Sequence, residues 1–257
     1  MSGSLIRLDL HPLVDHDWRQ SCREQLNHSG ALVLRQFLHP TALQAIIEEG
    51  NAQRHLAYHT LSKHNVYLMK PDEAFSPEHP RNRDVFSTKG CITDDIIPAE
   101  SPLRQLYNDE LFKSFLCYVL GEEALYPYAD PLSSVNLHYA PHGQELGWHF
   151  DNSSFAITLL IQKPLAGGVF QYVKDLRDAD SGEMNFAGVE AVLDERRPVE
   201  ALAIDAGDLV LFRGRNSLHR VTPTEGEITR MLAVLAYNTQ PGIALSETAR
   251  MTFYGRV

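Results

Sequence analysis

Three residues in the second half of this chain have the types and order of a set of metal ligands. His149 and Asp151 lie two positions apart, and His219 follows much later. Two imidazoles and one carboxylate form the facial triad that holds non-haem Fe(II) and leaves neighbouring positions open, which suits activation of O2. Residues i and i+2 of a strand project to one face, so His149 and Asp151 can reach one ion. His219 must then come from a distant strand, across the fold.

A cation follows the triad at the start of an apolar segment. Arg230 precedes residues 231–237, which read as a long strand. A guanidinium is a fixed fork of donors that matches a carboxylate, and an Arg in apolar surroundings needs such a partner to offset its desolvation. The distal carboxylate of 2-oxoglutarate would supply one. Tyr139 could donate its hydroxyl to the same carboxylate, although an ordinary core aromatic explains this residue equally well.

The order of these signals carries more weight than the spacing of His149 and Asp151. A chain with 12 histidines contains some pairs of this kind by chance. Here the pair is followed by a Gly167-Gly168 turn, a Gly207-Asp208 hairpin, the second histidine and then the arginine. This sequence of features predicts one metal site built from several strands.

The segment 133–237 resembles the Fe(II)/2-oxoglutarate-dependent oxygenase superfamily in its HxD pair, distal histidine and following arginine. Shorter stretches look like a bacterial group that hydroxylates or halogenates free amino acids: 147–155, 159–162 and 167–170. The resemblance implies Fe(II) on the triad, 2-oxoglutarate as co-substrate on Arg230, and O2 as oxidant. Halogenating members have Gly or Ala at the carboxylate position, which frees a site for chloride. Because this chain has Asp151 there, the resemblance implies hydroxylation.

The surrounding pattern predicts an α+β fold. Helical spacing marks residues 15–28, a segment that begins at Pro40, and residues 102–120, whereas short alternating or apolar runs follow Gly121. Helices followed by many short strands favour a double-stranded β-helix, or jelly roll, with helices packed on one sheet. We expect a single domain over 1–257. Its parts would be a mainly helical 1–125, a jelly-roll core over 126–240, and a C-terminal tail or lid over 241–257.

Substrate contacts are less constrained by the pattern. An amino-acid substrate needs a cation for its carboxylate, and Arg83, on the long polar loop of residues 70–83, is the leading candidate, although a solvated loop charge is the simpler interpretation. The other candidates lie on strands near the triad or close to the C-terminus: Asn136, His138, Asn152, Tyr237, Asn238 and Tyr254. A tail that carries aromatic residues could close over the site as a lid.

The bulk composition excludes several classes of protein. A net charge of −10 without any Lys/Arg run argues against nucleic-acid binding. The three cysteines Cys22, Cys91 and Cys117 are too few and too far apart for a disulfide framework or a zinc site. No signal peptide and no apolar run of membrane-spanning length is visible. We expect a cytoplasmic protein that acts on a small molecule, with its oligomeric state left open.

These observations predict hydroxylation of an unactivated C–H bond in a small polar substrate, such as a free amino acid. Three alternatives remain. The substrate could be a peptide, a nucleoside or another natural-product intermediate. The chain could be a jelly-roll binding module without catalysis, which an incomplete triad would have favoured. A cupin-type metal enzyme would draw more histidines to the metal and would not need Arg230.

Overall fold

The computed structural model describes residues 5–257. Its helices begin where the sequence supplies caps. Asp15 accepts from the amide of Trp18 at the start of the first helix, and Gly30 ends it in the left-handed conformation with φ 75°. The helices are α1 (His16–Ser29), α2 (Pro40–Gln53), α3 (Pro102–Asn108), α4 (Glu110–Leu120), α5 (Phe186–Leu193) and α6 (Glu247–Tyr254), with 3-10 turns η1 (Arg54–Leu56) and η2 (Asp94–Ile96).

Most strands belong to one sheet in the order β1-β10-β6-β13-β4-β3-β5-β11-β8-β9, with β2 paired to β3. The strands are β1 (Ala31–Leu34), β2 (Tyr58–Asn65), β3 (Asp84–Ile92), β4 (Val135–Ala140), β5 (Leu146–His149), β6 (Ala156–Gln162), β7 (Ala166–Gly167), β8 (Phe170–Val173), β9 (Glu200–Leu202), β10 (Leu209–Phe212), β11 (Leu218–Val221), β12 (Thr224–Glu225) and β13 (Arg230–Leu235). The short strands β7 and β12 pair separately.

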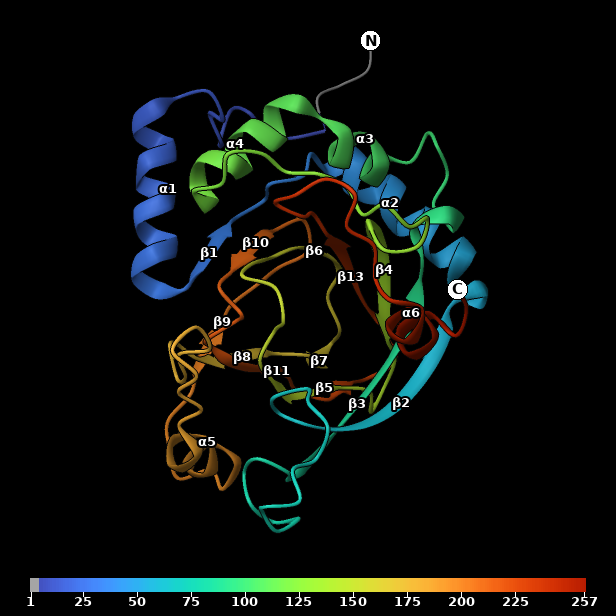
Figure 1. Cartoon of the computed structure of the whole chain (residues 1–257). Helices are drawn as coiled ribbons and strands as arrows, with labels where there is room; N and C mark the ends of the chain where they lie inside the picture. The colour runs from blue at the N-terminus through green and yellow to red at the C-terminus, as the bar shows by residue number, and fades with distance from the viewer. Residues whose placement is uncertain (1–4) are drawn as a thin grey trace.

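The sheet curls back on itself, so that β10, β6, β13 and β4 lie opposite β8, β11 and β5 (Figure 1). Strand β3 makes this closure possible, because it pairs with β4 through Gly90, Cys91 and Ile92 and with β5 through Ser87. The result is the predicted jelly roll, with an inner face toward the opposing strands and an outer face.

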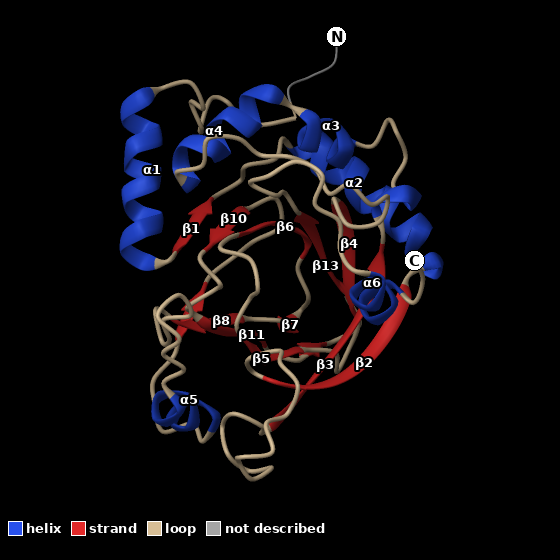
Figure 2. Ribbon diagram, viewed as in Figure 1, coloured by secondary structure: helices blue, strands red, loops and turns tan. Residues whose placement is uncertain are grey.

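Helices α1 to α4 cover the outer face of the larger layer (Figure 2). One hydrophobic core joins these helices to β4, β6, β10 and β13, and its central side chains include Phe112, Phe115, Leu159 and Leu211. The expected packing of helices on one sheet is therefore confirmed. Helix α6 lies apart from this layer, near β3.

The elements differ from the expected pattern in three places. The helix expected over residues 102–120 is two helices, because the Asp109 side chain accepts from the Phe112 amide and caps a new one. Strands β2 and β3 lie within the part expected to be mainly helical. Helix α5 lies within the polar segment of residues 175–197, which reads as an insertion between strands, and Asn185 caps it.

Strand register settles which side chains face the inside. In the β4–β13 pair, Tyr139 is opposite Met231 and Ala140 is opposite Arg230, so Tyr139 and Arg230 lie on different faces. The Tyr139 hydroxyl donates to the carbonyl of Gly50 in α2 over 2.7 Å. The expectation that Tyr139 shares a carboxylate with Arg230 was therefore wrong, and its interpretation as a core aromatic is correct.

Tyr237 is also a core residue. Its ring stacks on Tyr107 with centroids 4.2 Å apart, and its hydroxyl donates to the Tyr107 carbonyl. This places it among the helices of the outer layer, so it is corrected from a substrate contact to a packing residue.

Tyr139→Phe should lower the free energy of unfolding by about 1 kcal/mol, because it removes one buried hydrogen bond and little volume. Urea unfolding would measure this loss. The KM for 2-oxoglutarate should stay at the wild-type value. A raised KM with unchanged stability would contradict the outward placement of this hydroxyl.

Candidate active site

The structure brings His149, Asp151 and His219 together at one point. Their ligand atoms all lie within 4.8 Å of one another. Asp151 Oδ1 is 3.6 Å from His149 Nε2 and 3.5 Å from His219 Nε2. The imidazole rings are 4.1 Å apart between centroids. Two imidazole nitrogens and a carboxylate oxygen therefore converge as one metal needs.

The triad is assembled differently from the expectation. His219 does not reach across the fold, because β11 pairs directly with β5 and His219 is the register partner of His149. Asp151 lies just beyond the end of β5, so its direction is set by the following loop and not by strand alternation.

Both imidazoles are oriented by backbone carbonyls. His149 Nδ1 donates to the Gly147 carbonyl over 2.8 Å, and His219 Nδ1 donates to the Ser217 carbonyl over 2.9 Å. These bonds leave each Nε2 lone pair free toward the other ligands. Burial, together with the charge of His219, lowers the pKa of His149 to about 3. The ring is therefore neutral at physiological pH, as a metal ligand requires.

A close contact with Gly214 holds Asp151 in place. The Asp151 amide donates to the Gly214 carbonyl over 3.1 Å. A Cβ on Gly214 would lie 1.8 Å from Asp151 Oδ2, so only glycine leaves room for the carboxylate. That same oxygen is buried and has no hydrogen-bond partner within residues 5–257. A carboxylate oxygen left in this state fits a metal ion, whose charge would compensate its burial.

A chain of hydrogen bonds that could not be predicted from the sequence holds Gly147, the residue whose carbonyl orients His149. The Gly147 amide donates to Ser87 Oγ over 3.0 Å, and the Ser87 hydroxyl lies 2.7 Å from His64 Nε2. His64 Nδ1 is satisfied by the Asn65 carbonyl, so the Ser87 hydroxyl donates to Nε2. Ser87 thereby joins β2, β3 and β5 beside the triad. His64, Ser87 and Gly147 come together only through the register of three strands, and no local sequence motif predicts their contact.

Arg230 is buried and faces the inside of the sheet. It lines a cavity of about 260 Å³ together with Leu160, Gly168, Phe170 and Leu202. Gly168 leaves space for it, since a Cβ there would lie 2.9 Å from Arg230 Cδ. Burial lowers the pKa of Arg230 to about 10, so the guanidinium stays charged at neutral pH. Among the described residues its Nε has no acceptor, which fits a carboxylate ligand.

Phe170 connects this cavity to the triad. Its ring stacks on His219 with centroids 5.5 Å apart and an angle of 25° between the planes, and it also lines the Arg230 cavity. A small dicarboxylate that reaches the metal could therefore extend past Phe170 to Arg230.

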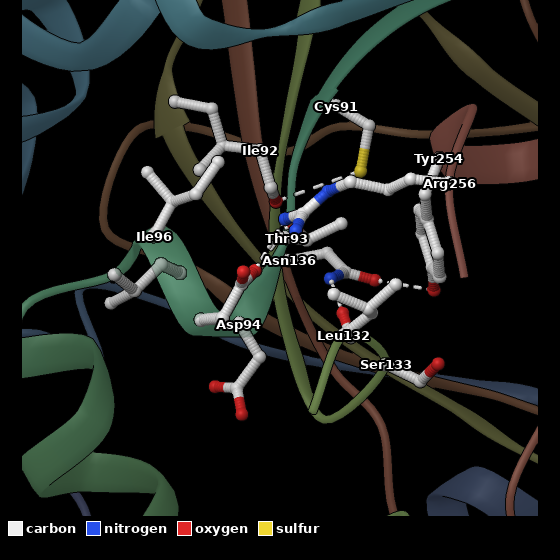
Figure 3. Close-up of polar contacts among 12 residues, drawn as sticks. Cys91, Ile92, Thr93, Asp94, Ile96, Leu132, Ser133, Asn136, Tyr254 and Arg256 are labelled. Carbon is white, nitrogen blue, oxygen red and sulfur yellow. Dashed lines mark hydrogen bonds and ion pairs between the residues drawn. The ribbon is translucent and has the colours of Figure 1, made fainter. Parts of the chain in front are cut away.

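The remaining substrate candidates divide by position. Asn136 and His138 share the inner face, and Asn136 Oδ1 accepts from the Tyr254 hydroxyl over 3.0 Å (Figure 3). Asn238 Nδ2 is buried and has no partner in the described part of the chain. The Asn152 side chain is exposed, and its carbonyl accepts from Arg215.

The prediction that Arg83 is the cation for the substrate carboxylate was wrong. It forms an ion pair with Asp194 and donates to the Leu193 carbonyl, so it fastens the loop to the end of α5. Its neighbour Arg81 is buried, donates to the Lys70 carbonyl over 3.0 Å, and has an Nη1 that no described residue pairs. The sequence could not show which of these two arginines is paired within the protein, because the partner of Arg83 lies at the end of α5, far away in the chain.

The Halogenase D family model matches residues 14–252. The chain belongs to the Halogenase D family. Together with the convergent triad, this makes it an Fe(II)/2-oxoglutarate-dependent enzyme, with O2 as the third participant. A search of curated proteins finds no match.

Solved structures show the same fold as this Halogenase D member. The α-ketoglutarate-dependent epimerase SnoN from nogalamycin biosynthesis has a TM-score of 0.61 at 13% identity, covering 87% of this chain and 81% of that one. AviO1 from Streptomyces viridochromogenes has a TM-score of 0.58 at 17% identity, covering 89% and 97%. A Pseudomonas putida prolyl-4-hydroxylase has a TM-score of 0.52 at 13% identity, covering 84% and 98%. No described helix is both long and apolar enough to cross a bilayer.

Gly214→Ala should displace the Asp151 carboxylate and weaken Fe(II) binding about 10-fold or more. The added methyl overlaps Oδ2, and this overpacking should also destabilise the metal-free protein by about 1–3 kcal/mol. Fe(II) titration and urea unfolding would measure the two effects.

The matched control is the same substitution in an Asp151→Gly background, where the overlapping atoms are gone. There Gly214→Ala should cost much less stability, because the two sites are in contact. Equal costs in both backgrounds would show that the glycine is needed for some other reason.

Proposed function

We propose that this enzyme hydroxylates an unactivated C–H bond in a small polar substrate, with a free amino acid as the leading class. The observation that supports hydroxylation is Asp151 Oδ1, which lies at nearly equal distance from the two Nε2 atoms and supplies a third ligand. Family membership supports the oxygenase class, and the amino-acid substrate is carried from the sequence resemblance.

The chain's own residues would divide the work as follows. His149, Asp151 and His219 would hold Fe(II), and Arg230 would hold the distal carboxylate of 2-oxoglutarate in the cavity beside Phe170. When bound, the iron, 2-oxoglutarate and O2 supply the oxidising power for C–H hydroxylation, with succinate and CO2 as the co-products. The protein orients these groups and excludes water, with Ser87 and Gly214 keeping two ligands in position.

Arg230→Met should raise the KM for 2-oxoglutarate by roughly 30-fold or more, since losing such a buried charged pair costs about 2–5 kcal/mol. The KM for the prime substrate should change far less. Arg196→Met is the matched control, because Arg196 is an exposed arginine on the surface. A KM for 2-oxoglutarate near the wild-type value would place the co-substrate elsewhere.

The substrate class is tested by a screen under Fe(II), ascorbate and 2-oxoglutarate. The twenty amino acids form the first panel, and short peptides, nucleosides and natural-product intermediates form the second. Substrate-dependent succinate and a product heavier by one oxygen would support the proposal. Stimulation by the second panel alone would assign the oxygenase to another substrate class.

Hydroxylation and halogenation are distinguished by product mass in high chloride. Asp151 fills a ligand position and adds a negative charge, so chloride would have to displace it and approach that charge. The wild-type enzyme should therefore give only the oxygenated product. Asp151→Gly should lose most hydroxylation, and trace halogenation would also require shaped space for the halide. A chlorinated product from the unmutated protein would refute Asp151 as a permanent ligand.

A further inference from the structure

Lys89 places an ammonium group on the inner face of the sheet, beside the active site. It precedes Cys91 by two residues on β3, and Cys91 is the register partner of the inward His138. Ser87 lies two residues before Lys89, and its hydroxyl accepts a hydrogen bond from Gly147 on β5, the strand that carries His149. Neighbouring strands are about 5 Å apart, and only β4 separates Lys89 on β3 from Arg230 on β13, so Lys89 and Arg230 border the same inner space.

This ammonium has no hydrogen-bond or ion-pair partner among the described residues. It lies over the ring of Phe253 in α6, with 5.7 Å from Nζ to the ring centroid. The side chain is half-buried, and burial lowers the pKa of Lys89. Burial and the positive charges of Lys89 and Arg230 also lower the pKa of His138 well below its usual value. This part of the inner face is therefore positive, and no carboxylate of residues 5–257 pairs with Lys89.

Helix α6 covers Lys89 and is firmly attached. The Tyr254 hydroxyl donates to Asn136, and Arg256 donates to Thr93 and Asp95 over 2.6 Å each (Figure 3). The helix ends at Tyr254, and a Cβ on its C-cap Gly255 would lie 2.4 Å from the Tyr58 ring. A charge beneath such a cover is poorly solvated, which strengthens its attraction to an anion.

The other cations near the site are less suited to a substrate anion. Arg230 faces the cavity beside Phe170, and Arg83 is paired with Asp194. The guanidinium of Arg177 lies 4.2 Å above the Phe150 ring, and its Nε donates to the Arg215 carbonyl. Arg81 is a rival, since no described residue pairs with its Nη1, but it lies on a loop and not on the inner face of the sheet.

We propose that Lys89 binds a carboxylate of the prime substrate, which would then lie between β3 and α6 with its reacting carbon toward the triad. This inference rests on the proposed function, because it takes the inner space to be a small-molecule site. It adds a selection rule: the substrate bears a free carboxylate, and the amide of the same molecule is a poor substrate.

The first test compares wild type with Lys89→Met, which keeps the length of the side chain and removes its charge. The probes are each amino acid that stimulates succinate formation, and its carboxamide. Lys89→Met should raise the KM for the amino acid about 10-fold or more and leave the KM for 2-oxoglutarate within about 2-fold. It should also abolish the preference for acid over amide. Lys89→Arg should restore part of that preference.

Lys63→Met is the matched control, because Lys63 lies on the adjacent strand β2 and is exposed and paired with Asp84. Three results would overturn the proposal. A rise in the KM for 2-oxoglutarate alone would assign Lys89 to the co-substrate. Loss of the acid preference in Arg81→Gln but not in Lys89→Met would assign the substrate carboxylate to Arg81. If Lys89→Met changed thermal stability but neither KM, Lys89 would have only a structural role through its contact with Phe253.

A binding test separates failure of this inference from failure of the proposed function. Thermal stabilisation of the metal-free protein is measured with two- to six-carbon carboxylic acids and their amides. Stabilisation of wild type by the acids alone, lost in Lys89→Met, would support Lys89 even if no amino acid is a substrate. Absence of any stabilisation by carboxylates in wild type would overturn the assignment.

Discussion

The register of β5 against β11 is the constraint on which the active site depends. It places His149 and His219 side by side, with both rings on one face. A slip by one residue would turn one imidazole to the opposite face. The register is secured on both sides, since β11 also pairs with β8 and β5 is tied to β3 through Ser87. Pairing between strands that are far apart in the sequence therefore fixes the positions of His149 and His219 more firmly than a loop could.

Unpaired buried charges accompany this rigid frame. Asp151 Oδ2 and Arg230 Nε lack hydrogen-bond partners within the described residues, and the Lys89 ammonium lies over the Phe253 ring without an ion pair to any of those residues. Each is unfavourable in the free protein, because a buried polar group without a partner costs free energy. Two cations and one anion around the same inner space suit ligands of opposite charge, which supports the proposals of a metal ion at Asp151 and carboxylates at Arg230 and Lys89. The rigid sheet is what keeps these charges unpaired, because in a more flexible structure the side chains would pair with one another or turn to solvent.

The sequence predicted the parts of this arrangement that local pattern controls. The first helix, expected over residues 15–28 and found at 16–29, the triad, and the strand that begins at Arg230 all follow from residue type and spacing. It failed where distant segments decide. Tyr139 donates to a helix, Arg83 pairs with α5, and His219 reaches the metal site from the neighbouring strand. The need for glycine at 214 depends on a loop 63 positions away from Asp151 and could not be read from either segment alone.

The contact between Gly214 and Asp151 also bears on the choice between two reactions in one family. Removing a ligand carboxylate opens a coordination position, but the open space must then accept a halide. Here the space around Oδ2 is shaped for a flat carboxylate against the glycine Cα, and no donor within residues 5–257 is directed at that oxygen. A halide in that space would lie against carbon and would lack the hydrogen bonds that stabilise a desolvated anion. The packing around Asp151 therefore adds a steric and hydrogen-bonding argument to the electrostatic one for the proposed hydroxylation.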